Sequence, residues 1–245
     1  TGFIHQLKDM KEALPGYDYI GVGRDDGKEK GEHSAIFYRT DKFDVIEKGD
    51  FWLSETPDVP SKGWDAVLPR ICSWGHFKCK DTGFEFLFFN LHMDHIGKKA
   101  RVESAFLVQD KMKELGKGKE LPAILTGDFN VDQTHQSYDA FVSKGVLCDS
   151  YEKAGFRYAI NGTFNDFDPN SFTESRIDHI FVSPSFQVKR YGVLTDTYRS
   201  IVGKGEKKQA NDCPEEIDIK TYQARTPSDH FPVKVELEFD QRQQK

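Results

Sequence analysis

The chain lacks several features that would assign it to a class of protein at once. It has no run of about eighteen apolar residues, so no segment is predicted to span a membrane. It has no internal repeat and no excess of positive charge, because 34 Lys and Arg face 40 Asp and Glu, a formal net charge of −6. No global positive field is therefore available to hold nucleic acid. Any phosphate-bearing substrate must be neutralised locally, by individual arginines and a metal ion.

Cysteine is scarce, and its spacing does not indicate a zinc site. There is no C-x-x-C motif and no pair of short spacings of the kind that zinc ligands need. We predict free thiols, with a Cys72–Cys79 bridge as the alternative. The cysteines are Cys72, Cys79, Cys148 and Cys213.

The sequence has neither an initiator methionine nor a signal peptide. Its first residues already belong to a helical pattern, in which Phe3, Leu7, Met10 and Leu14 recur until Pro15 ends the pattern. We therefore expect residues upstream of Thr1. A cytoplasmic, a secreted and a periplasmic protein all fit this sequence, so it assigns no compartment.

The length and the mixture of elements predict a single α/β domain. The 245 residues can bury a sizeable core, and we expect one domain over residues 1–245. Strand-like segments outnumber helices, and hairpin connections occur beside a helical crossover at residues 98–116, which favours packed mixed sheets over a purely parallel sheet. We expect hairpins of residues 35–38 with 43–46 and of 71–77 with 84–90, an ordered loop at 54–69, late strands at 177–182 and 233–239, and an insertion loop at 199–222.

The strongest local signal for chemistry follows a buried strand. The apolar residues 121–125 lead through Gly127 to Asp128, Phe129 and Asn130. In an extended backbone Asp128 and Asn130 would share one face, while Phe129 would turn into the core. A carboxylate and a carboxamide can together hold a hard cation, a phosphate oxygen or a water. The alternative is a turn with a purely local role, because Asp and Asn both favour turns.

A second strand, over the Phe-rich residues 84–89, leads to Asn90, His92 and Asp94. Alternation places these three polar residues on one face. His92 would then point into a cleft; the alternative is a polar loop in which the histidine has no role. The Phe-rich strand itself is predicted to belong to the core rather than to form a surface for stacking bases, because its rings lie in a continuous apolar run.

A carboxylate at the start of an apolar strand needs a partner. Asp178 opens the apolar residues 180–182, and burying it unpaired would cost several kcal/mol. His230, just ahead of the last strand, is the natural partner. An Asp that fixes the tautomer of a His makes a base or an electrostatic clamp near neutral pH.

Two further charged residues lie next to predicted strands. Glu32 precedes the strand at 35–38, and Arg70 precedes the strand at 71–77. An arginine presents a planar fork that suits a phosphate group. The alternative for both residues is an ordinary solvated charge.

Taken together, these segments resemble the endonuclease/exonuclease/phosphatase superfamily, which includes deoxyribonuclease I. The resemblance covers roughly residues 17–239, and residues 51–57 further resemble a bacterial subgroup of undefined substrate. It implies a deoxyribonuclease I-like four-layer sandwich, in which two packed mixed β-sheets are flanked by helices. It also implies a divalent cation, usually Mg²⁺ with Mn²⁺ as an alternative, and hydrolysis of a phosphoester. The matching segments are Asn-Leu-His at 90–92, Gly-Asp-Phe-Asn at 127–130, Arg-Ile-Asp-His at 176–179 and Ser-Asp-His-Phe-Pro-Val at 228–233.

The resemblance implies roles for individual residues. His230 with Asp178 is similar to the catalytic His-Asp pair of the family, and Asp229 is similar to a carboxylate on the metal side. Asp128 would orient the attacking water or bind the metal, and Asn130 would donate a hydrogen bond to a phosphoryl oxygen.

Three more positions complete the implied site. His92 resembles the second active-site histidine, which Glu32 would support, and Arg70 resembles a phosphate-contacting arginine. The family also carries an Asn at the end of its first strand and a metal-binding Glu at the end of the next. Both would lie upstream of Thr1.

We therefore predict a Mg²⁺-dependent phosphoric ester hydrolase in which water attacks phosphorus in line. A phosphodiester is the expected substrate, as in a nuclease or phosphodiesterase. The alternatives are a phosphomonoesterase acting on a sugar or lipid phosphate and a non-catalytic pseudoenzyme that binds a partner. The third segment differs from the Trp-Cys-Asp-Arg of the inositol polyphosphate phosphatases, which argues against inositol phosphates. No obligate protein partner is indicated.

Overall fold

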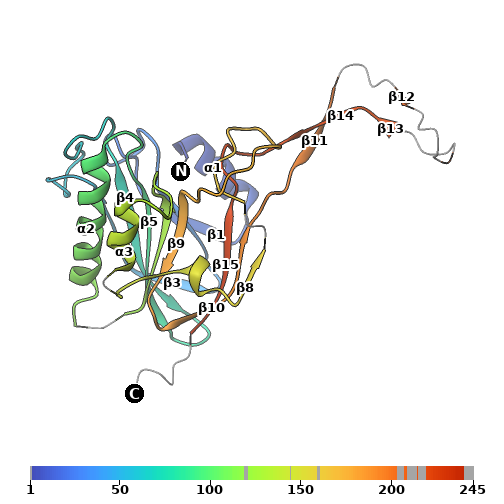
Figure 1. Cartoon of the computed structure of the whole chain (residues 1–245). Coiled ribbons are helices and arrows are strands. Elements are labelled where there is room, and N and C mark those ends of the chain that lie inside the picture. Colours follow the sequence, from blue (N-terminus) through green and yellow to red (C-terminus); the bar gives the residue numbers. More distant parts are fainter. Residues whose placement is uncertain are drawn as a thin grey trace.

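Two β layers face each other, and helices lie outside them, in the computed structural model of the chain (Figure 1). The structure describes residues 2–118, 121–143, 145–158, 161–202, 207–208, 214 and 219–239. The helices in this part of the chain are α1 (Ile4–Ala13), α2 (Lys98–Leu115), α3 (Gln136–Val142) and α4 (Ser150–Lys153).

The larger layer is a mixed sheet of six strands in the order β3-β4-β5-β6-β9-β7. β3, β4 and β5 form an antiparallel meander, β5 runs parallel to β6 after the crossover through α2, and β9 runs antiparallel to β6. The strands are β3 (Phe43–Trp52), β4 (Ile71–Cys79), β5 (Glu85–His92), β6 (Ala123–Asp128), β7 (Cys148–Asp149) and β9 (Asp178–Val182).

The register of this sheet aligns three polar side chains. His92, the last residue of β5, is paired with Asp128, the last residue of β6. Asp128 is in turn paired with Asp178, the first residue of β9. Because residues opposite each other in neighbouring strands project from the same face, the three side chains form one row at one edge of the sheet.

The second layer consists of two separate sheets, β15-β10-β8 and β1-β2. Both pack on the same face of the larger sheet: Ile20 and Ile36 contact Phe77, and Val188 belongs to a cluster with Ile124. The strands are β1 (Tyr17–Ile20), β2 (Ile36–Arg39), β8 (Phe156–Tyr158), β10 (Phe186–Val193) and β15 (Val233–Phe239).

The opposite face of the larger sheet is covered by α2 and α3 (Figure 1). The side chains of Ala105, Val108 and Met112 on α2 pack into one cluster with Phe129 and Phe141. The Phe-rich strand β5 belongs to the core, as expected, because Phe89 is fully buried and the rings of its neighbours pack between the two layers.

An arm projects from the body of the molecule (Figure 1). It begins with β11 (Tyr198–Ile201) paired antiparallel with β14 (Tyr222–Arg225), and the short strands β12 (Lys207–Lys208) and β13 (Ile219–Lys220) pair farther out. The predicted insertion at 199–222 is thus a two-stranded arm where the structure describes it.

Most predicted elements are present, but one predicted hairpin is wrong. The segments at 35–38 and 43–46 do not pair with each other: β2 pairs with β1, and β3 pairs with β4 in the other layer. A turn joins them, but it passes the chain from one layer to the next.

Cys72, Cys79 and Cys148 are free thiols, as predicted, and Cys213 lies outside the described residues. None of the described helices is long and apolar enough to cross a membrane.

Gly127 permits the close approach of β5 and β6. It has φ +146°, a conformation that side chains rarely adopt, and a Cβ atom there would collide with the carbonyl oxygen of Leu91. We expect Gly127→Ala to lower the free energy of unfolding by about 3 kcal/mol, through backbone strain and overpacking.

Urea denaturation of the variant measures this effect. Gly155→Ala is the matched control, because the nearest atom to its added Cβ is the oxygen of Lys189 at 3.5 Å. Equal unfolding midpoints for the two variants would contradict the assignment.

Candidate active site

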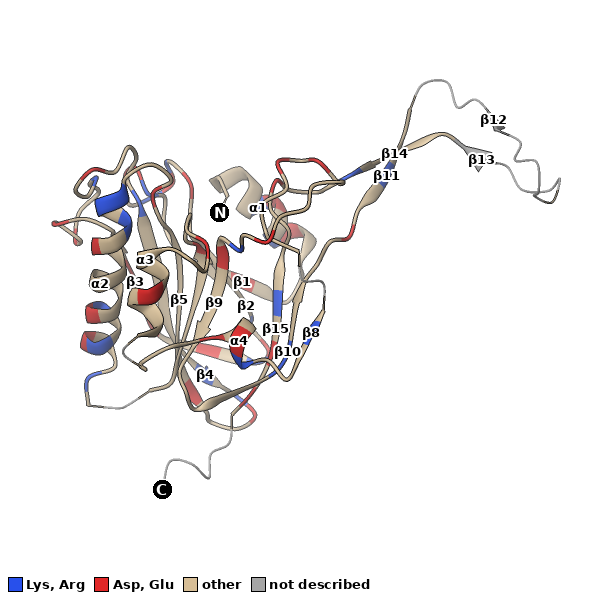
Figure 2. Cartoon of the chain, in the orientation of Figure 1, with Lys and Arg blue, Asp and Glu red and all other residues tan. Residues whose placement is uncertain are grey.

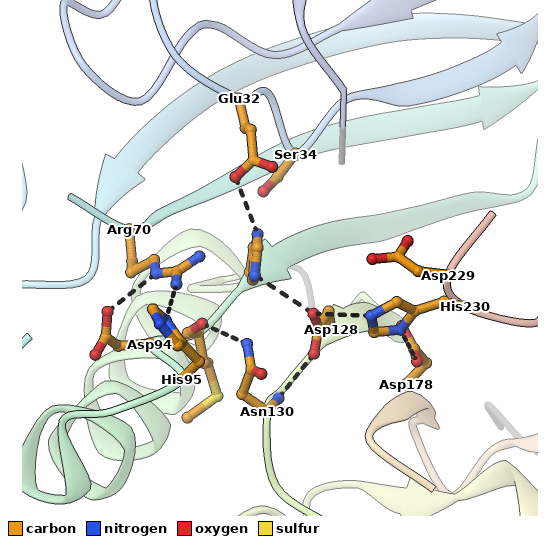
Figure 3. Close-up of polar contacts among 12 residues, drawn as sticks. Glu32, Ser34, Arg70, Asp94, His95, Asp128, Asn130, Asp178, Asp229 and His230 are labelled. Carbon is orange, nitrogen blue, oxygen red and sulfur yellow. Dashed lines mark hydrogen bonds and ion pairs between the residues drawn. The ribbon is translucent and has the colours of Figure 1, made fainter. Parts of the chain in front are cut away.

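The row of His92, Asp128 and Asp178 meets His230 from the second layer at the edge of the sheet (Figure 3). His230 lies just before β15, and its Nδ1 is 2.7 Å from Oδ2 of Asp178. The Nε2 atom of the same ring is 3.9 Å from Oδ2 of Asp128. The structure therefore brings together the His-Asp pair that the sequence predicted.

The two carboxylates change the proton affinity of the groups around them. Burial lowers the pKa of His230, but the hydrogen bond and the negative charge of Asp178 outweigh it, so the pKa of His230 is raised. Burial, together with the negative charge of Asp178, raises the pKa of Asp128 to about 6. A carboxyl group that titrates near neutrality is typical of functional sites.

His92 lies between two carboxylates. Its Nε2 is 3.3 Å from Oδ2 of Asp128, and its Nδ1 is 3.6 Å from Oε2 of Glu32. Glu32 also forms an ion pair with Arg24. Burial, helped by the positive charge of Arg70, holds the pKa of His92 well below its usual value. The neutral ring has a single N–H, so it can donate to only one of its two carboxylate neighbours.

Asn130 reaches the site by a different route from the predicted one. β6 ends at Asp128, and Asn130 has φ +50°, so simple alternation along an extended strand does not place it. Its backbone N–H donates to Oδ1 of Asp128, and its Nδ2 donates to the carbonyl oxygen of Met93 at 3.0 Å. The second N–H of the amide group is left for another acceptor. Phe129 is fully buried, as predicted.

Arg70 is buried and fixed at the edge of the site (Figure 3). Its Nε donates to Oδ1 of Asp94 at 3.2 Å, and its Nη2 lies 2.9 Å from Nδ1 of His95. Its Nη1 is buried and has no hydrogen-bond partner among the described residues. A buried donor without a partner is costly unless a ligand satisfies it.

Asp94 does not share the face of Asn90 and His92, so that expectation was wrong. It follows the end of β5 and is buried, where it accepts hydrogen bonds from the backbone of Ile96 and Gly97 as well as from Arg70. Asn90 has a structural role: its Nδ2 donates to the carbonyl oxygen of Ala35, and its Oδ1 accepts from Thr126.

The donor set suits a divalent cation. Asp128, Asp178 and His230 each offer one ligand atom, and these atoms lie within 4.8 Å of one another. Carboxylate oxygens are the ligands that Mg²⁺ and Mn²⁺ prefer. Asp229 lies beside His230 (Figure 3), and its negative charge helps to raise the pKa of His230, but it is not part of this group among the described residues. Its role as a metal ligand stays a prediction.

Sequence reasoning missed two parts of the site. His95 contacts Arg70, but nothing in its neighbourhood distinguishes it from a surface histidine. Phe164 packs edge to face against the ring of His230, with the ring centroids 5.2 Å apart. It comes from a loop for which no role was predicted, although residues 161–168 are rich in Asn, Asp and Phe.

Several known proteins are similar to this chain. A crystallised endonuclease/exonuclease/phosphatase family protein from Bacteroides thetaiotaomicron is 85% identical, with a TM-score of 0.90, over 98% of this chain and 82% of that one. A mannosyl-6-phosphatase from Bacteroides thetaiotaomicron VPI-5482 is also 85% identical, with a TM-score of 0.89, over 97% of this chain and 82% of that one. An uncharacterised protein of Acanthamoeba polyphaga mimivirus is 30% identical over 96% of this chain and 82% of its own length.

The sequence model of the endonuclease/exonuclease/phosphatase family matches residues 10–230, nearly the whole chain. The match spans the first three segments that carried the resemblance and reaches His230 in the fourth, and the two packed β layers have the deoxyribonuclease I-like arrangement that it implied. The chain therefore belongs to the endonuclease/exonuclease/phosphatase family of phosphoesterases.

Proposed function

We propose that the protein is a phosphomonoesterase that removes phosphate from a sugar phosphate. The observation that carries this proposal is the 85% identity to the Bacteroides mannosyl-6-phosphatase along nearly the whole chain. The phosphodiester expected from the sequence is the competing substrate. Lys and Arg do not gather into a stripe on the part of the chain that Figure 2 colours, and α2 carries both signs, which does not favour a nucleic-acid polymer.

In the proposed mechanism a water molecule attacks phosphorus in line with the leaving oxygen. Asp128 orients this water, and His230, held in one orientation by Asp178, shares with Asp128 the task of handling its proton. Asn130 donates its second amide N–H to a phosphoryl oxygen, which stabilises negative charge as it develops.

Arg70 binds the phosphate through Nη1, the buried donor that has no partner in the described protein. The hydrogen bonds to Asp94 and His95 hold the guanidinium in place before the substrate binds. His92 lies beside Asp128, and burial together with the positive charge of Arg70 lowers its pKa and keeps it neutral, so it donates its one N–H to the phosphoryl group or the leaving oxygen.

Asp128 and Asp178, with His230 beside them and Asp229 as the further candidate, would hold a Mg²⁺ or Mn²⁺ ion. Such an ion neutralises the phosphate and polarises the bond to phosphorus. The carboxylates of Glu32, Asp128 and Asp178 lie in the site, while Arg24 is already paired with Glu32 and Arg70 with Asp94. The side chains alone therefore do not supply the positive charge that a phosphomonoester dianion needs.

His230→Ala should lower kcat/KM for a phosphomonoester by about 10²–10⁴-fold, because the variant loses a group that stabilises charge and handles a proton. Steady-state hydrolysis of mannose 6-phosphate and of a model phosphodiester, side by side, measures the loss and identifies the preferred ester. His5→Ala, at an exposed histidine, is the control. Undiminished activity of His230→Ala would refute its role, and faster hydrolysis of the diester would refute the phosphomonoesterase.

Chelation of divalent cations should abolish hydrolysis, and added Mg²⁺ or Mn²⁺ should restore it. Titration of the wild type and of Asp128→Asn with Mg²⁺ in a calorimeter tests the site separately from turnover, and the variant should bind the ion at least about tenfold more weakly. Full activity in the presence of chelator would contradict the metal site. Metal binding without hydrolysis of any ester would favour the pseudoenzyme.

Asp94→Asn should raise KM for the ester, because the guanidinium of Arg70 loses its charged partner.

The same substitution should also change how the free energy of unfolding depends on pH. Although burial opposes ionisation, hydrogen bonds from the backbone N–H groups of Gly97 and Ile96 and from the side chain of Arg70 lower the pKa of Asp94 to about 2. Its contribution to stability is therefore present above the ordinary pKa and is lost as pH falls from about 4 to about 2.

Unfolding by urea at several pH values measures this contribution. The wild type should exceed Asp94→Asn by about 2 kcal/mol near neutral pH. The difference should shrink as pH falls toward 2, and a difference that is independent of pH would contradict the assignment.

A further inference from the structure

A loop over residues 161–175 leaves aromatic side chains in solvent, and one of them lies against His230. Phe164 is 42% exposed, yet its ring contacts that of His230 edge to face, with a centroid distance of 5.2 Å and an interplanar angle of 74°. Phe167, three residues later, is 61% exposed. Large aromatic side chains that stay exposed beside a site are a frequent feature of ligand-binding surfaces.

This loop is fixed to the catalytic segment. The backbone N–H groups of Asn165 and Asp166 donate to the carbonyl oxygen of Asp229, and Phe231 donates to Thr163 at 2.7 Å. The side chain of Asn165 is fully buried, and its Oδ1 accepts from the backbone of Phe167 at 2.8 Å. The positions of the two phenylalanines therefore follow that of His230.

The backbone is strained at Phe167. Its φ is +60°, a left-handed conformation that bulky side chains rarely adopt, whereas the neighbouring Asp166, with φ +52°, is of a residue type that tolerates this region. Burial of the ring does not compensate for the strain, because Phe167 is mostly in solvent. Backbone strain of this kind persists in folded proteins mainly at functional sites, where a particular geometry is required.

We propose that Phe164 and Phe167 form an aromatic platform that stacks against the pyranose ring of the leaving group. The inference rests on the proposed function. In a hexose 6-phosphate one methylene group separates the ring from the ester oxygen. With phosphorus held between Asp128 and His230, the sugar ring lies within reach of Phe164. The C–H groups on one face of a pyranose carry partial positive charge and pack against the negative face of an aromatic ring.

The test compares a ring ester with an open-chain ester of the same phosphate geometry, mannose 6-phosphate and glycerol phosphate. The wild type should have the higher kcat/KM for the sugar ester. Phe164→Ala and Phe164→Leu should lower the ratio of the two kcat/KM values by about tenfold, whereas Phe164→Tyr should keep it, because stacking needs an aromatic face. Phe167→Ala should lower the ratio in the same direction. Phe156→Ala, at a phenylalanine that is 58% exposed on β8, is the matched control.

A merely structural role of Phe164 would disturb His230 and lower both activities in proportion, so an unchanged ratio in Phe164→Ala overturns the platform. Calorimetric binding of the two esters with divalent cations chelated repeats the comparison without turnover. If the wild type hydrolyses neither ester, the proposed function fails. If it binds the sugar ester no more tightly than the glycerol ester, the platform fails, whatever the outcome for hydrolysis.

Discussion

The register of three neighbouring strands determines where the candidate active site lies. β5 and β6 run parallel and end side by side, and β9 begins at the same edge, so His92, Asp128 and Asp178 fall into one row. Gly127 allows this register, because only a residue without Cβ fits against the carbonyl oxygen of Leu91. The backbone pairing of the three strands, rather than side-chain contacts, places these residues in one row.

The fourth member of the site comes from the other layer. His230 precedes β15, which packs against the larger sheet through a cluster that includes Ile124 and Val188. The pair of Asp178 and His230 therefore forms only when the two layers are packed, and the loop carrying Phe164 moves with His230 because its backbone is bonded to that segment. The site and the proposed sugar platform thus depend on the same interface between sheets.

The sequence predicted the candidate catalytic groups better than their surroundings. Asp128, Asp178 and His230 were found because a polar residue at the end of an apolar strand is a local signal. The residues of one motif do not all belong to the site. In residues 176–179, Asp178 faces the site. Arg176 forms a buried ion pair with Asp149, and His179 forms a hydrogen bond with the carbonyl oxygen of Val131. Local spacing does not encode which distant segment will lie opposite a given residue. The hairpin predicted at 35–46 and the position predicted for Asp94 are therefore wrong, and the contacts of His95 and Phe164 were not predicted.

The charges of the site couple the binding of a cation to the binding of an ester. Asp128 has its pKa raised to about 6 because it is buried beside Asp178, so the folded protein holds these carboxylates together at an electrostatic cost. A cation held by these carboxylates would relieve that cost, and the phosphate of an ester would meet Arg70, whose Nη1 has no partner among the described residues. The cation and the ester would then satisfy complementary deficits in the site, and each should bind more tightly in the presence of the other.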